Sequence, residues 1–83
     1  MDTRVAIVGI ILDDRSSAAE VNRILSEYGD YVIGRMGIPY KARGENIISL
    51  VMDAPMDVVN TLSGKLGKLP GISTKTIYAK ENN

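Results

Sequence analysis

Residues 5–12 read Val-Ala-Ile-Val-Gly-Ile-Ile-Leu, an unbroken apolar run in which β-branched side chains predominate. A run of this length and composition is typical of a strand buried on both faces. It is far shorter than the roughly 20 apolar residues that a membrane span requires, and the chain contains no longer apolar run. We therefore expect a cytoplasmic protein with no membrane partner, in which this strand is central.

A helix is predicted directly after this strand. Residues 17–20, Ser-Ala-Ala-Glu, fit a capping box, in which the Ser and Glu side chains bond reciprocally to backbone N–H groups. Gly29 is placed to end the helix in the left-handed conformation. Apolar side chains recur between these signals at the spacing of one helix face, namely Val21, Ile24, Leu25 and Tyr28.

A hairpin is predicted next. Residues 31–39 form its first strand, where Gly34 and Gly37 mark bulges or a close backbone approach and Pro39 excludes a central position in the sheet. Residues 41–45 form a polar turn, and residues 47–52 form the second strand of the hairpin.

The last third of the chain repeats the pattern of a helix followed by a strand. Asp53 and Pro55 mark the start of a second helix, a turn follows at residues 69–71, and residues 72–79 alternate as a fourth strand. The predicted apolar stripe of this helix contains Met56, Val59, Leu62 and Leu66.

This element order is the ferredoxin-like βαββαβ arrangement of the α+β class, with two helices on one face of a four-stranded antiparallel sheet. Right-handed crossovers place the first and third strands in the middle. At 83 residues the chain is one small domain, which we assign to residues 1–80, with a frayed tail at residues 81–83.

Two helices cover only one face of such a sheet, so the second apolar face of the central strands needs another cover. A second copy of the chain is the simplest candidate, and we expect a homo-oligomer, either a dimer or a tetramer. The alternative is that long side chains on the same face, such as Tyr31, Arg35 and Lys75, shield it.

The composition excludes several functions. The ten Lys and Arg residues balance the ten Asp and Glu residues, so the chain lacks the broad basic field expected for direct nucleic-acid binding. Because His and Cys are absent, imidazole catalysis, thiol nucleophiles, disulfides and Cys/His metal sites are excluded. We expect no cofactor and no metal.

The best candidate site lies between the first strand and the first helix, at Asp14, Arg15, Ser16 and Ser17. The N–H groups of a helix N-terminus, the two hydroxyls and the guanidinium could together hold a carboxylate or a phosphate. The alternative is ordinary capping, with Asp13 and Asp14 keeping the turn solvated.

No other cluster predicts chemistry. Arg35, Lys41 and Arg43 gather on the second strand and its turn, but without Phe or Trp they form no stacking platform for bases, so we interpret them as a solvated edge. No pair of Asp, Glu, Lys, Tyr or Ser stands out as catalytic, and we predict a protein that is not an enzyme.

The chain resembles a known family in several strings. The turn Leu69-Pro70-Gly71-Ile72 into the last strand is similar to that of the ACT-domain superfamily. Residues 8–10, 35–40 and 46–50 resemble the small stand-alone proteins named iron-only hydrogenase system regulators. Asp14 and Arg15 match the Asp-Arg of the Asp-Arg-Pro-Gly pattern of amino-acid-binding ACT domains, and Ser16 and Ser17 replace its Pro-Gly.

The resemblance implies an oligomeric module that senses a ligand or binds a partner. Its fold is also similar to the regulatory domain of the nickel-responsive repressor, whose His and Cys ligands have no counterpart here. We therefore expect a non-enzymatic regulator, acting in iron-only hydrogenase regulation, that senses a small anionic ligand. The alternative is a structural adaptor that binds a protein partner through its exposed sheet face and takes no small molecule.

Overall fold

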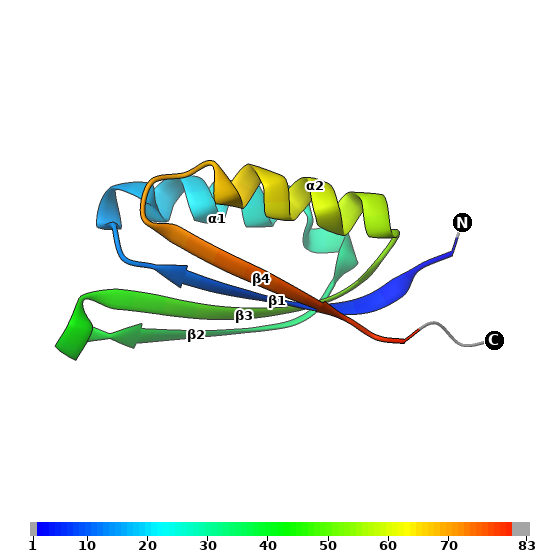
Figure 1. Ribbon diagram of the computed structural model, residues 1–83, viewed down its shortest axis with the longest axis horizontal. Coiled ribbons are helices and arrows are strands. Elements are labelled where there is room, and N and C mark those ends of the chain that lie inside the picture. The colour runs from blue at the N-terminus through cyan, green and yellow to red at the C-terminus, as the bar shows by residue number, and fades with distance from the viewer. Residues whose placement is uncertain (1, 81–83) are drawn as a thin grey trace.

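The computed structural model describes residues 2–80, so the tail predicted at residues 81–83 lies outside the described part. The predicted ferredoxin-like α+β fold is confirmed: the sheet is antiparallel, in the order β2-β3-β1-β4, and both helices lie over one face of it (Figure 1). The elements are β1 (Arg4–Leu12), α1 (Ala18–Glu27), β2 (Val32–Tyr40), β3 (Glu45–Ala54), α2 (Met56–Gly67) and β4 (Ile72–Tyr78).

The hydrophobic core lies between the sheet and the two helices. Alternate side chains of β1 and β3 point toward the helices and are buried, while each helix contributes one apolar stripe, as its spacing predicts. Met56, the first member of the predicted α2 stripe, stays 39% exposed. The core is formed by Ala6, Val8, Ile10, Val21, Ile24, Leu25, Tyr28, Ile48, Leu50, Met52, Ala54, Val59, Leu62 and Leu66.

The opposite face of the sheet carries no layer within the chain (Figure 1). Burial of β1 on both faces is therefore wrong for the single chain: Val5, Ile7 and Ile11 each remain 42–43% exposed. Shielding by Arg35 is also wrong, because Arg35 pairs with the buried Leu50 and so lies on the helix side of β2.

The predicted caps of α1 differ from the observed ones. Ser17 precedes the helix but makes no side-chain cap bond, and the Glu20 carboxylate pairs with Arg23 at 2.6 Å, so the capping box does not form. The capping residue is Asp14, which caps the short 3-10 turn Arg15–Ser17 that leads into α1. Gly29 does not adopt a left-handed conformation, because the chain continues into another 3-10 turn.

Strand β2 is an edge strand, as Pro39 predicts. The register shifts between Val32 and Gly34, which confirms a bulge at Gly34, whereas Gly37 pairs regularly with Ile48 and the bulge predicted there is wrong. The hairpin turn closes at Gly44, whose φ of 66° is left-handed. At the start of α2 the structure has Pro55 in the capping position, and no side chain caps that helix.

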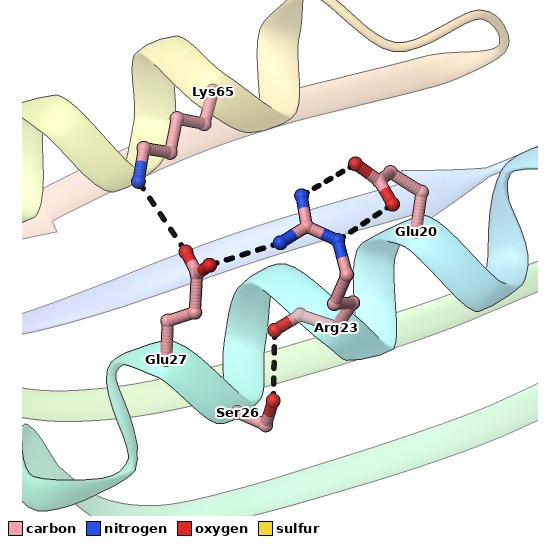
Figure 2. A network of polar contacts seen from close by, with 5 residues as sticks. All are labelled: Glu20, Arg23, Ser26, Glu27 and Lys65. Carbon is pink, nitrogen blue, oxygen red and sulfur yellow. Dashed lines mark hydrogen bonds and ion pairs between the residues drawn. The ribbon is translucent and has the colours of Figure 1, made fainter.

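A surface network joins the two helices (Figure 2). Arg23 bonds to Glu20 and to Glu27 on α1, and Lys65 of α2 reaches Glu27 at 3.3 Å while lying 5.3 Å from the centre of the Tyr28 ring. The hydrogen bond from Arg23 lowers the pKa of Glu20. Exposed pairs of this kind contribute little to stability, so the helices are held mainly by the core beneath them.

The turn before β4 lies directly against the loop after β1. The backbone N–H of Asp13 donates to the carbonyl of Gly71 at 2.9 Å. Gly71 has a φ of 72°, and a Cβ at this position would lie 2.9 Å from the backbone nitrogen of Asp14 and against its Cβ. Only glycine fits both the backbone conformation and the space.

Gly71→Ala should therefore destabilise the protein by about 2–5 kcal/mol, because left-handed strain and overpacking add. Gly44→Ala is the matched control, since Gly44 also has a positive φ but open space around its Cβ position, and it should cost about 1–2 kcal/mol. Urea unfolding of both variants measures the difference. Equal losses would contradict the close approach at Gly71.

Candidate functional site

The segment predicted to bind an anion forms the tight turn between β1 and α1. Asp14 Oδ1 accepts hydrogen bonds from the Ser16 backbone N–H at 2.9 Å and from Ser16 Oγ at 2.7 Å. These bonds lower the pKa of Asp14, the side-chain bond having the larger effect. The structure thus brings Asp14 and Ser16 together, and a carboxylate of the chain itself occupies part of the donor set.

Ser17 has a structural partner. Its side chain is buried, and Ser17 Oγ donates to the carbonyl oxygen of Pro70 at 2.8 Å. This bond and that between Asp13 and Gly71 hold the β1–α1 loop against the turn before β4. The Ser17 hydroxyl is therefore committed to tertiary structure.

Arg15 is exposed, and its side chain makes no hydrogen bond or ion pair within residues 2–80. Of the four predicted residues, it alone has a charged side chain that is not engaged inside the chain. Binding of an anion at Asp14, Arg15, Ser16 and Ser17 stays a prediction, resting now on Arg15 and the neighbouring backbone.

Within residues 2–80 the structure contains no cluster of three or more metal-ligating side chains, and no helix long and apolar enough to cross a membrane. A wide concavity of about 820 Å³ lies beside the start of β1 and the start of α2. It mixes acidic and basic side chains, Asp2, Asp53 and Asp57 among the acids and Arg4 and Lys80 among the bases.

A smaller concavity, of about 280 Å³, lies between α1 and the β2–β3 hairpin and includes Arg35. Sequence reasoning assigned Arg35 to a solvated edge and missed this hollow. The alternation of β2 was the available signal, because it places Arg35, Gly37 and Pro39 on the same side of the strand.

Comparison with known proteins finds a family whose model matches most of the chain. Residues 4–76 match the TM1266-like family, described as "Iron-only hydrogenase system regulator, putative". Among solved structures, uncharacterized protein TM1266 from Thermotoga maritima is 31% identical and superposes with a TM-score of 0.91, over 95% of this chain and 100% of that one. No curated protein matches the chain.

A second solved structure shares the fold alone. Formyltetrahydrofolate deformylase from Pseudomonas putida KT2440 is 15% identical, with a TM-score of 0.63 over 88% of this chain. The match spans 28% of the deformylase, so it concerns one part of a longer protein. The likeness concerns the fold of this part and nothing beyond it.

Ser17→Ala should destabilise the protein by about 1–2 kcal/mol, because the Pro70 carbonyl loses its donor in a partly buried place. Ser26→Ala is the control, since Ser26 Oγ makes an exposed bond to its own helix at Arg23, and it should change stability by less than about 0.5 kcal/mol. Thermal and urea unfolding report both values. If Ser17→Ala were as stable as the control, the structural role of the Ser17 hydroxyl would be contradicted.

The Asp14 carboxyl should titrate below its ordinary pKa of 3.8 in a carbon-detected NMR titration. Because the folded-state pKa is lowered, its contribution to stability is present above the unfolded value and is lost as the pH falls through the folded value. Ser16→Ala should raise the Asp14 midpoint toward 3.8, whereas Ser26→Ala should leave it unchanged. An Asp14 titration midpoint that is unchanged in Ser16→Ala would contradict the assignment of these hydrogen bonds.

Proposed function

Because the chain belongs to the TM1266-like family, we propose that it is a regulatory module with no catalytic step of its own, which acts as an oligomer assembled across the uncovered face of its sheet. The family description is that of a regulator of the iron-only hydrogenase system. Regulation of that system is the proposed setting.

The observation that carries the proposal is the apolar character of that face, hereafter the open face. On β1 and β3 its side chains alternate with the buried ones, and the exposed large apolar members of the face are 36–67% exposed. Isolated exposed apolar residues are ordinary, but a contiguous set marks an interaction surface. The large exposed members are Val5, Ile7, Ile11, Met36, Ile38, Tyr40, Ile47 and Ile77.

The open face is large enough for a small dimer interface. Four strands about 4.8 Å apart and about seven residues long at about 3.3 Å each span a plane of roughly 400 Å². Side chains that stand up from this plane raise the accessible area toward the roughly 800 Å² per partner of a standard interface. Soluble monomers rarely leave contiguous apolar patches larger than a few hundred Å² in water, so a face of this size is typical of an interaction surface.

Charge distribution favours a second copy as the occupant. Charged residues at open-face register positions are Glu45 and Asp53 near the ends of β3 and Lys75 on the edge strand β4, where it pairs with Gly9. The middle of the two central strands carries no charge. The formal net charge of zero removes general repulsion between copies. Small residues, Gly9 and Ser49, lie side by side in the middle and allow a partner sheet to approach closely.

The same experiments also test two alternative functions. In the first, the open face binds a different protein and the chain is a structural adaptor. In the second, a small anionic ligand is sensed at Asp14, Arg15, Ser16 and Ser17, and the unpaired guanidinium of Arg15 within residues 2–80 supports it.

Light scattering during gel filtration should show a dimer or larger assembly for the natural chain. Ile77→Lys should shift it toward monomer, with the dissociation constant raised at least about tenfold, because a charge is buried in an apolar interface. Ile77 is 67% exposed on an edge strand, so the variant should fold. Met56→Lys, at an apolar residue 39% exposed on α2, is the control and should assemble normally.

A natural chain that stays monomeric at all concentrations would overturn self-association and leave the open face to a different protein. Native mass spectrometry of the same samples detects small molecules that the protein retains. A discrete extra mass that is lost in Arg15→Ala would support sensing at residues 14–17, and an extra mass retained in that variant would contradict it.

A further inference from the structure

The hollow between α1 and β2 is lined by residues of four elements, β1, α1, β2 and β3. It has a volume of about 280 Å³ and lies on the helix side of the sheet, where β2 extends past the cover of α1. Its apolar wall includes Leu12 of β1, Val21 of α1 and Ile48 of β3, all buried. Its polar lining comes from Asn22, Arg35 and Asn46.

The hollow exists because Gly37 has no side chain. Gly37 pairs with the buried Ile48, so it occupies a helix-facing position where an apolar side chain would ordinarily pack beneath α1. A Cβ placed on Gly37 would have no heavy atom within 4 Å, and φ at this residue is not positive. Neither strain nor close packing therefore requires glycine here, and the position leaves room for a ligand.

The polar side chains of the hollow offer N–H donors. Arg35 Nη2 donates to Asn22 Oδ1 at 2.9 Å, which bridges β2 to α1 and uses one of the five N–H donors of the guanidinium. Within residues 2–80, no Asp or Glu forms an ion pair with Arg35. The amide N–H groups of Asn22 and Asn46 likewise have no acceptor among the described residues.

No carboxylate lines the hollow, and Arg35 supplies its one positive charge. A guanidinium with amide donors beside it matches the two oxygens of a carboxylate, and a single charge is balanced by a monoanion rather than by a phosphate dianion. The apolar wall suits a short branched alkyl group, and the volume is below that of drug-sized ligand sites.

We propose that this hollow binds a small aliphatic monocarboxylate, whose oxygens are held by Arg35, Asn22 and Asn46 and whose alkyl group packs on the apolar wall. The site is separate from residues 14–17, and its polar lining lies on the helix side of the sheet, although Ile38 and Ile47 belong both to its lining and to the open face. It goes beyond the proposed function, and because its test reads binding at the helix side of β2, it can fail while the oligomer stands, or stand while the oligomer fails.

The probe is isovalerate, titrated into the isotope-labelled protein and followed by amide chemical shifts. Saturable shifts are expected at Asn22, Arg35, Gly37 and Asn46, including the side-chain amides of both Asn residues. Isovaleramide, which has the same alkyl group and no charge, should bind at least about tenfold more weakly, because a charge-assisted hydrogen bond is lost.

Two variants and two controls make the test specific. Arg35→Gln removes the charge and should weaken isovalerate binding at least about tenfold, whereas Arg43→Gln, at an Arg paired with Glu45 in the hairpin turn, should not. Gly37→Val should fill the hollow and abolish binding. Gly34→Val is its control, because Gly34 lies on the same strand but faces the opposite side of the sheet.

The stability of Gly37→Val separates filling from unfolding. Because nothing lies within 4 Å of its Cβ position, this variant should be at least as stable as the natural chain toward urea. Absence of saturable shifts, equal binding of isovaleramide, or unchanged binding in Arg35→Gln or Gly37→Val would each overturn the proposal.

Discussion

The rest of the structure depends on one constraint: β1 is apolar at nearly every position, yet the two helices can cover only one side of it. Even-numbered residues of β1 form the floor of the core, with Val8 fully buried. The odd-numbered ones, such as Ile7, carry equally apolar side chains into the open face. Folding of one chain buries one face of this strand, and the proposed association would remove the other face from water.

Topology could be read from the sequence because each boundary carries a local signal. Apolar runs, helix stripes and turn residues such as Pro39 and Gly44 act through their immediate neighbours. The errors arise where another group, distant or local, competes for the same side chain. Ser17 has the right spacing for a capping box, but the carbonyl of Pro70, 53 residues away, takes its hydroxyl, and Arg23 takes the Glu20 carboxylate. The Pro70 carbonyl lies outside any local pattern, whereas the pair of Glu20 and Arg23 is a local i, i+3 contact that competes with the cap.

The candidate sites also combine features that the local sequence predicts with features that only packing decides. The turn at Asp14 was predictable because strand, acidic residues and helix start are consecutive in sequence, but which hydroxyls remain available for a ligand is decided by packing. The hollow at Arg35 and Gly37 could not be found from periodicity alone, because Asn22 reaches it from α1, which no pattern along β2 places beside that strand. The alternation along β2 indicates only the residues that this strand contributes to the site.

The bonds that join the β1–α1 loop to the turn before β4 also bear on the order of folding. Asp13 and Ser17 find their partners in Gly71 and Pro70, close to the end of the described chain. Contacts of such long sequence separation form after the intervening chain has closed into a loop. During synthesis, the loop that precedes α1 therefore remains without its partners until the turn before β4 has left the ribosome. Its final shape reports that the last strand has docked.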